Sequence, residues 1–249
     1  MNTASAPLGI VILAAGKGTR MNSDIAKVLH EMNGRPLIHY VIEQTRDSLP
    51  EKTVIIIGHQ REAVTAVLQE YPVDTAVQDP QLGTGHAVQQ AEAMFDGFTG
   101  DILVLSGDVP LLRRETIAEL VQVHRDTKSA ITVLTAYLED PTGYGRVVRS
   151  ESNAVRKIVE HRDATPEELE LNEINTGIYL FRSELLFERL HALQPDNAQG
   201  EYYLTDVVKM AAEEGLSVQA VIAADPQEIQ GINTVAQLQE MERNYLARL

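Results

Sequence analysis

The residues best suited to chemistry stand in a glycine-rich, basic loop near the start of the chain. Gly16 and Gly18 flank Lys17, and Arg20 and Lys27 follow shortly after. Glycines let the backbone turn tightly and approach a ligand, so that successive N–H groups can converge on phosphate oxygens, and the cations add favourable charge. This spacing indicates a polyphosphate site, with an ordinary strand-to-helix connection as the alternative.

Two well-known phosphate-binding loops are excluded at this position. The dinucleotide fingerprint requires a third glycine or an alanine where the chain has Met21, and the P-loop requires a glycine and a Ser or Thr where the chain has Val11 and Gly18. A nicotinamide-dependent oxidoreductase is therefore disfavoured.

A carboxylate follows another apolar run. Asp108 comes directly after Gly107 and shortly before Pro110, behind the run 101–106. A carboxylate in this place can hold a hard divalent cation between the protein and substrate phosphates. The alternative is an aspartate that caps a turn or a helix.

Alternating strands and helices must position these loops. The apolar patterns predict strands at 9–13, 53–58, 72–78 and 101–106, and helices at 36–46, 60–70 and 84–95, the last with Thr84 as its N-cap. This alternation favours an α/β fold: a Rossmann-like, doubly wound, mostly parallel sheet covered on both faces. The loops after residues 13, 78 and 106 then meet at the carboxyl ends of the strands, where such sheets bind ligands.

The second half of the chain predicts a smaller mixed β subdomain. Strands are expected at 131–138, 145–149 and 174–181, with a turn at 143–145 that forms a hairpin, and helices at 201–213 and 234–248.

Composition limits the classes of function. The chain has 249 residues, 36 acidic against 21 basic ones, and a formal net charge of −15, which opposes a nucleic-acid footprint. It has no cysteine, no signal-like N-terminus and no apolar run of membrane-spanning length. We therefore expect a cytoplasmic protein with neither nucleic acid nor membrane as a partner.

Several blocks together carry a family resemblance that covers essentially the whole chain. They resemble the sugar-1-phosphate nucleotidyltransferases and, more narrowly, the uridyltransferase half of the bacterial bifunctional enzymes that make UDP-N-acetylglucosamine. The blocks are 13–21 with Lys27, 81–86, 107–110, 140–146, 158–161, 173–177, 197–203 and 231–233.

The resemblance implies an enzyme and its reaction. The expected enzyme is an N-acetylglucosamine-1-phosphate uridyltransferase, which would join UTP and N-acetylglucosamine 1-phosphate by in-line, Mg²⁺-assisted attack on the α-phosphorus and release pyrophosphate. The alternatives are a nucleotidyltransferase for another sugar 1-phosphate or nucleotide, and a non-catalytic nucleotide-sugar sensor. The whole chain, 1–249, would be one domain, with a nucleotide-binding half at 8–110, a sugar-phosphate-binding half at 111–233 and a C-terminal helix at 234–249.

The resemblance also assigns site residues. The nucleotide-binding set is Leu13, Ala14, Gly16, Gly18, Lys27, Gln78, Gly83 and Thr84. The sugar-phosphate-binding set is Thr84, Gly145, Glu160, Asn175 and Asn233. The catalytic residues would be Arg20, Lys27 and Asp108, and Asp108 and Asn233 would hold Mg²⁺. For His86 we expect packing or hydrogen bonding at a helix start and no catalytic role.

Three departures from the family pattern carry expectations. Ser106 stands before Gly107 and Asp108 where the family has aromatic or small residues, and we expect little consequence of this difference. The family usually has proline before the lysine of the opening loop, and Ala26 in its place should loosen the backbone at Lys27. The bifunctional relatives continue into a left-handed β-helix that transfers acetyl groups and imposes a trimer. No repeat of that kind is present, so we expect no acetyl transfer and a monomer or weak homo-oligomer.

Overall fold

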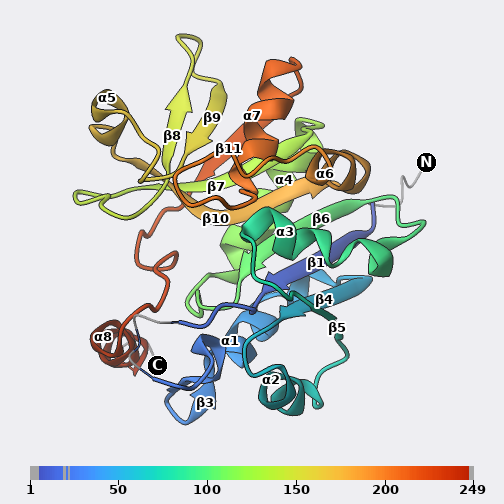
Figure 1. The fold of residues 1–249 in the computed structure, drawn as a ribbon, viewed down its shortest axis with the longest axis vertical. Coiled ribbons are helices and arrows are strands. Elements are labelled where there is room, and N and C mark those ends of the chain that lie inside the picture. Colours follow the sequence, from blue (N-terminus) through green and yellow to red (C-terminus); the bar gives the residue numbers. More distant parts are fainter. Residues whose placement is uncertain (1–5, 19–20, 22, 247–249) are drawn as a thin grey trace.

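The computed structural model describes residues 6–18, 21 and 23–246 of the chain (Figure 1). Arg20, one of the predicted catalytic residues, lies outside the described residues.

A nine-stranded sheet forms the centre of the molecule. Its strands are β1 (Leu8–Leu13), β4 (Lys52–Ile57), β5 (Asp74–Val77), β6 (Asp101–Ser106), β7 (Ile131–Tyr137), β8 (Arg146–Arg149), β9 (Val155–Val159), β10 (Glu173–Arg182) and β11 (Val218–Ile222). The order is β11-β7-β10-β6-β1-β4-β5, and only β10 runs antiparallel to its neighbours in this path. The predicted mostly parallel, doubly wound sheet is confirmed. It continues across the two predicted halves, whose boundary at residue 110 stays a prediction.

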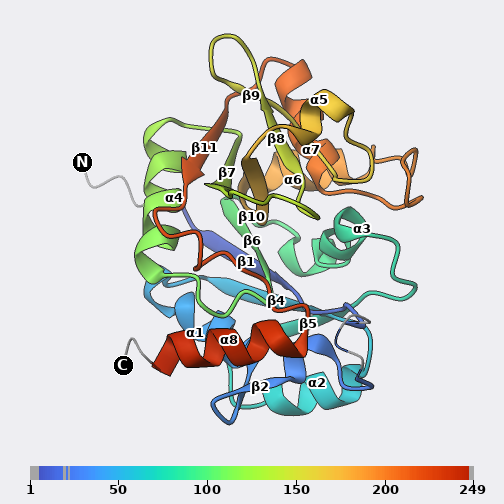
Figure 2. The same cartoon turned by 90° about the vertical axis from the view of Figure 1, so that its left-hand side faces the viewer.

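Helices cover both faces of this sheet. They are α1 (Leu37–Gln44), α2 (Arg61–Leu68), α3 (Thr84–Gln89), α4 (Arg114–Asp126), α5 (Pro166–Leu169), α6 (Ser183–Leu190), α7 (Thr205–Glu213) and α8 (Val235–Leu246). A two-stranded ribbon, β2 (Glu31–Met32) and β3 (Arg35–Pro36), precedes α1. Figures 1 and 2 show α3, α6 and α7 on one side of the sheet and α1 and α4 on the other.

The alternation of side chains along the buried strands divides the core into two layers. In β1, Ile10 and Ile12 pack in the layer under α1, α2 and α4, whereas Val11 packs in the layer under α3, α6 and α7. All three side chains are fully buried, and each contributes roughly 1.5–3 kcal/mol to folding. Uninterrupted apolar runs therefore become strands that are covered on both faces.

A third apolar cluster packs the last helix, α8, against the fold. Met241 of α8 is buried with Met21, Met32 and Tyr40, and the Tyr40 hydroxyl donates to the carbonyl of Met32 at 2.6 Å. Figure 2 shows α8 lying across α1 and β2. The expected C-terminal helix is thus present, with its apolar side packed against the fold.

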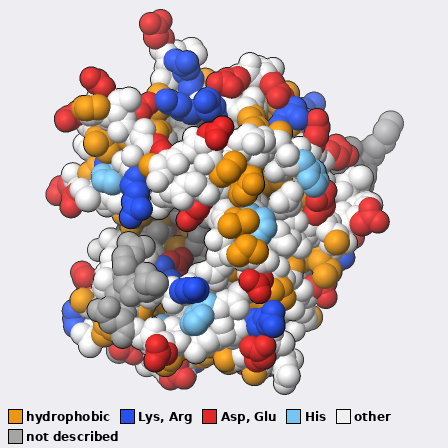
Figure 3. Space-filling model, in the orientation of Figure 1, with side chains coloured by type: hydrophobic (Ala, Val, Ile, Leu, Met, Phe, Trp, Pro, Cys, Tyr) orange, Lys and Arg blue, Asp and Glu red, His pale blue; other side chains and the backbone are white. Residues whose placement is uncertain are grey.

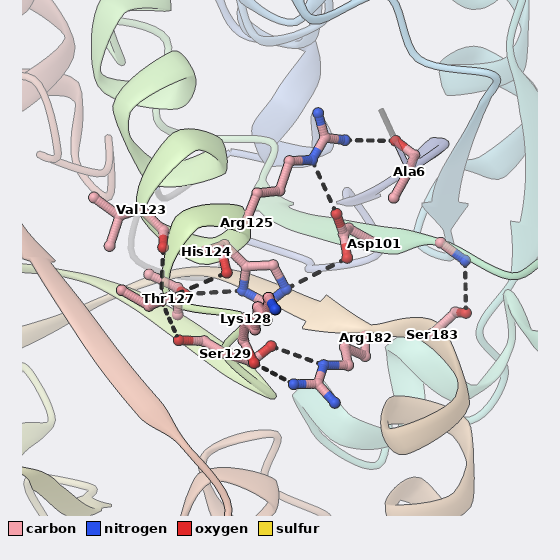
Figure 4. A network of polar contacts seen from close by, with 12 residues as sticks. Ala6, Asp101, Val123, His124, Arg125, Thr127, Lys128, Ser129, Arg182 and Ser183 are labelled. Atoms are coloured by element: carbon pink, nitrogen blue, oxygen red, sulfur yellow. Dashed lines mark hydrogen bonds and ion pairs between the residues drawn. The ribbon is translucent and has the colours of Figure 1, made fainter. Parts of the chain in front are cut away.

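A polar network ties α4 to the amino end of β6 (Figure 4). The Arg125 guanidinium donates to Asp101 at 3.2 Å, and His124 Nε2 lies 3.4 Å from the same carboxylate. His124 Nδ1 is 2.9 Å from the Thr132 hydroxyl. This network lies at the end of the strand opposite to Asp108, so its role is to hold helix and sheet together.

Two local predictions were wrong. Thr84 is the first residue of α3 and makes no capping bond. Its hydroxyl accepts from the Leu204 N–H at 3.0 Å, because 201–204 packs against the start of the helix.

The 143–145 turn does not join β7 and β8 into a hairpin. Both edges of β7 are taken by β10 and β11, so β8 pairs with β9 and touches β10 at one position.

No helix in the described part of the chain has the length and apolar character that crossing a membrane requires.

Candidate active site

The site begins where the order of the strands reverses. From β1 the chain crosses to β4 and β5 on one side, and then returns to β6 on the other side of β1. Leu13 and Ser106, the last residues of β1 and β6, are paired, and the Gly107 N–H donates to the Leu13 carbonyl at 2.9 Å. Loops that leave two neighbouring strands in different directions open a crevice at their carboxyl ends, which is where doubly wound sheets bind ligands.

A cavity of about 360 Å³ occupies this crevice. Figure 3 shows the hollowed face, with basic and acidic side chains in the hollow. The cavity is lined by eight predicted site residues, Leu13, Ala14, Gly16, Lys27, Gln78, Gly83, Thr84 and Asp108, and by Ala15, Val28, Gln81, Ala87, Ser106 and Glu201. Residues predicted for nucleotide binding and for catalysis are thus brought together.

Lys27 is the centre of the charged part of the cavity. Its ammonium forms an ion pair with Asp108 Oδ2 and donates to Asn233 Oδ1 at 2.7 Å. The three residues come from the loop after β1, the end of β6 and the segment after β11. Lys27 and Asp108 are largely shielded from water, which strengthens their attraction.

Gly18 allows the loop to pass close to this lysine. Its φ is +65°, and an added Cβ would lie 2.8 Å from Lys27 Cβ. Gly18 therefore shapes the loop around Lys27, although it does not line the cavity itself.

Two oxygens that converge on an ammonium are also suitable ligands for a hard metal ion. Asp108 offers a carboxylate and Asn233 an amide oxygen, the donor types that Mg²⁺ prefers. Within the described part of the chain no group of three or more His, Cys, Asp or Glu side chains is placed to hold a metal. The residues present fit a Mg²⁺ ion that takes the rest of its ligands from substrate phosphates and water.

The segment that carries Asn233 is anchored at two points. The buried Glu228 carboxylate accepts from the Arg113 N–H at 3.0 Å and from the Thr116 hydroxyl at 2.7 Å, at the start of α4. Further along, the Ile232 N–H donates to the Asp108 carbonyl at 3.0 Å. Asn233 is therefore held beside Asp108 by the backbone as well as by its side chain.

Gln78 and His86 form the wall beside α3. The buried Gln78 amide donates to the Gly83 carbonyl at 2.9 Å, and its nitrogen lies 3.2 Å from His86 Nδ1. Burial lowers the pKa of His86, which favours the neutral ring. His86 also lies beside the Tyr202 ring, so the expected packing and hydrogen-bonding role is confirmed.

The predicted sugar-phosphate residues Gly145 and Asn175 lie together, Gly145 directly before β8 and Asn175 on β10. The Asn175 N–H donates to the Gly145 carbonyl at 2.9 Å, and the Asn175 amide donates to the Tyr179 hydroxyl at 2.7 Å. The neighbouring Gly177 is placed so that a Cβ would lie 3.4 Å from Ser106 Oγ, which lines the cavity. This group therefore adjoins the cavity without lining it.

Glu160 lies at the end of β9, next to α7. Burial raises the pKa of its carboxyl, and the nearby Asp163, Asp206 and Glu201 act in the same direction, against a hydrogen bond from the Thr205 hydroxyl at 3.3 Å. A carboxylate disfavoured in this way gains from hydroxyl donors, and sugar hydroxyls are such donors.

Three polar residues that line the cavity were missed as site residues, besides the apolar Ala15, Val28 and Ala87. Gln81 donates through its side-chain amide to the Ala15 carbonyl and so fixes the loop after β1. Ser106 and Glu201 line the cavity. Gln81 and Glu201 stand inside blocks that carried the family resemblance, and Ser106 is the last residue of a predicted strand, so position was the signal that could have found them.

The fold and the site together define a class: α/β proteins with a cavity at the reversal point of a mostly parallel sheet. The comparison with protein families makes this specific. The chain belongs to the nucleotidyl transferase family, whose model matches residues 10–226.

Curated relatives narrow the resemblance further. The bifunctional protein GlmU of Geobacter metallireducens is 48% identical over 237 residues, which are 95% of this chain and 50% of that protein. The bifunctional protein GlmU of Burkholderia orbicola is 50% identical over 236 residues, 95% of this chain and 51% of that protein. The chain thus spans about half the length of these relatives, and the resemblance stated from the sequence blocks is confirmed.

Solved structures agree on the fold. A UDP-glucose pyrophosphorylase complexed with UDP-glucose superposes with a TM-score of 0.78 at 18% identity, covering 98% of this chain and all of that one. A putative glucose-1-phosphate thymidylyltransferase from Bacillus anthracis gives a TM-score of 0.74 at 24% identity, covering 97% and 95%. The nucleotidyltransferase fold is therefore shared well beyond the range of close sequence similarity.

Proposed function

We propose that the protein is an N-acetylglucosamine-1-phosphate uridyltransferase, which converts UTP and N-acetylglucosamine 1-phosphate into UDP-N-acetylglucosamine and pyrophosphate. The observation that carries the proposal is the contact of the Lys27 ammonium with Asp108 and Asn233 in the cavity. Relatives named GlmU at 48% and 50% identity support this substrate pair over others. A non-catalytic sensor would have no need of a partly buried lysine, carboxylate and amide at one point.

The reaction needs charge neutralisation more than proton transfer. A phosphate oxygen of the sugar phosphate forms a bond to the α-phosphorus of UTP while the bond from that phosphorus to the α–β bridging oxygen breaks, and this oxygen leaves with pyrophosphate. The attacking oxygen is already anionic, so no general base is required. Lys27 offsets the repulsion between the phosphates, and the backbone at Ala14 and Gly16 together with Gln78 and Gly83 holds the nucleotide.

Mg²⁺ is part of the proposal. Asp108 and Asn233 would hold it, and when bound it would neutralise phosphate charge. On the sugar side, Thr84, Gly145, Glu160 and Asn175 would contact N-acetylglucosamine 1-phosphate. Arg20 would add a second cation, and the cytoplasmic location and the monomeric or weakly oligomeric state stay predictions.

A pyrophosphate-release assay tests the proposal. Purified protein is given each of four nucleoside triphosphates with N-acetylglucosamine 1-phosphate, glucose 1-phosphate or no sugar, with and without Mg²⁺. We expect release to require Mg²⁺ and to be fastest with UTP and the N-acetyl sugar. Lys27→Met should lower kcat by roughly 10²–10³-fold, the range for loss of one electrostatic stabiliser of the transition state.

Lys17→Met is the matched control, because it removes the same charge from an exposed position of the same loop. We expect it to lower kcat by less than about tenfold. Absence of pyrophosphate with every substrate pair would refute an enzymatic function. Faster turnover with glucose 1-phosphate or with dTTP would instead assign a different substrate to the same fold.

A further inference from the structure

The position of Lys27 depends on the residue before it. Lys27 opens a short 3₁₀ turn, Lys27–Leu29, and Ala26 precedes the turn with φ −54° and ψ 137°. Ala26 is fully buried. A rotation at this residue would swing the Lys27 side chain away from Asp108 and Asn233.

The side chain of Gln60, in the segment between β4 and α2, holds the backbone at Ala26. The Ala26 N–H donates to Gln60 Oε1 at 2.8 Å, across 34 residues of sequence. Gln60 stands between β4 and α2 with φ +51° and ψ 40°, a left-handed conformation that residues with a Cβ adopt at a cost. The Gln60 carbonyl accepts from the Val64 N–H at 3.0 Å, which fixes Gln60 to the helix.

The geometry points to a positioning role: we propose that Gln60, through its hydrogen bond to the Ala26 N–H, sets the Lys27 ammonium for catalysis. The effect on turnover rests on the proposed function, whereas the backbone contact does not. The structure also revises the expectation that Ala26 leaves the loop loose, because the N–H that an alanine retains is held by Gln60.

Proline and Gln60 are alternative ways to fix the same backbone. The φ of −54° lies within the range to which the pyrrolidine ring restricts proline. A proline at position 26 has no N–H, and its ring would fill the space in which that hydrogen faces Gln60. Ala26→Pro and Gln60→Ala should therefore impair the protein singly and compensate each other when combined.

A double-mutant cycle tests this proposal. Wild type, Gln60→Ala, Ala26→Pro and the double variant are compared by kcat and KM in pyrophosphate release, thermal melting, and hydrogen exchange of the residue-26 amide where one exists. We expect Gln60→Ala to lower kcat by roughly 10–100-fold, the scale for a misplaced catalytic group, with a smaller effect on KM and faster amide exchange at Ala26. The double variant should recover at least about tenfold of that loss.

Gln69→Ala is the control variant, because it truncates an exposed glutamine at the other end of α2. It should leave kcat and Ala26 exchange unchanged. Wild-type exchange and turnover in Gln60→Ala would overturn the proposal, as would a double variant no better than Gln60→Ala. If Gln60→Ala fails to fold, recovery of folded protein in the double variant supports the proposal and its absence overturns it. If the wild type releases no pyrophosphate, the proposed function fails, and amide exchange still tests the contact.

Discussion

Replacing Gly83 by alanine should be one of the most damaging small changes in the molecule. Gly83 precedes α3 with φ +108° and ψ 176°, a conformation that is essentially restricted to glycine. An added Cβ would lie 2.7 Å from the Tyr202 carbonyl oxygen and 2.9 Å from the Tyr202 nitrogen. This neighbouring backbone is fixed on both sides, since Tyr202 donates to the Leu82 carbonyl and accepts from the Gly85 N–H, each at 2.8 Å.

The cost follows from these two effects. Backbone strain of this kind costs roughly 1–3 kcal/mol, and overpacking against groups that cannot move costs roughly 1–3 kcal/mol more. We therefore expect Gly83→Ala to lower the free energy of unfolding by about 4 kcal/mol. In a protein of this size such a loss corresponds to a fall in Tm of roughly 8–16 °C.

Urea unfolding followed by circular dichroism measures this loss. Gly16→Ala is the matched control in the same cavity, because its added Cβ would meet nothing within 4 Å; it should change stability by less than about 0.5 kcal/mol. Equal unfolding midpoints for Gly83→Ala and wild type would show that the segment at Tyr202 yields readily, and the reasoning would be refuted.

Three further predictions concern carboxylates. Burial raises the pKa of the Asp101 carboxyl, but His124 and Arg125 outweigh burial and hold that pKa below the ordinary 3.8. The ionised Asp101 carboxylate therefore stabilises the folded state fully above pH 3.8. This stabilisation is lost as the pH falls through the lower pKa of the folded state. Asp101→Asn should thus weaken the dependence of unfolding free energy on pH below about 4, and an unchanged acid limb would contradict this. The pKa of Glu160 is raised from 4.5, so its charge costs stability at neutral pH. Glu160→Gln should raise Tm at pH 7 while raising KM for the sugar phosphate; a lower Tm would count against it. Glu228→Ala should cost about 2–4 kcal/mol in urea unfolding, because it leaves the start of α4 without its partner, whereas a loss under 1 kcal/mol would show that water replaces the carboxylate.

The parts of the fold that could be predicted are those decided by local pattern. The runs that form β1, β4 and β6 are apolar on both faces, and no other environment suits them. The β7–β8 hairpin was wrong because β10, more than 30 residues further along, takes the edge of β7. No local signal at the 143–145 turn indicates that competition.

The site residues also divide into those that a local pattern predicts and those that it does not. The glycines and lysines of the opening loop indicate a phosphate site by their types, with an ordinary connection as the alternative, whereas Asn233 was assigned by family resemblance only. Its contact with Lys27 spans 206 residues, and the contact of Gln60 with Ala26 spans 34. Contacts of this kind depend on the completed topology, so single-sequence patterns do not contain them.

The contact between Asn233 and Lys27 joins two residues that the ribosome adds at very different times. At roughly 5–20 residues per second, a ribosome adds the 206 residues that follow Lys27, up to and including Asn233, in about 10–40 s. Once Asp108 has been made, the nascent chain contains two members of the cluster and can pair β1 with β6, but Asn233, the third member, is still missing. Under the proposed function, turnover by a growing chain would therefore begin only after β11, the last strand of the sheet, and Asn233 behind it have emerged.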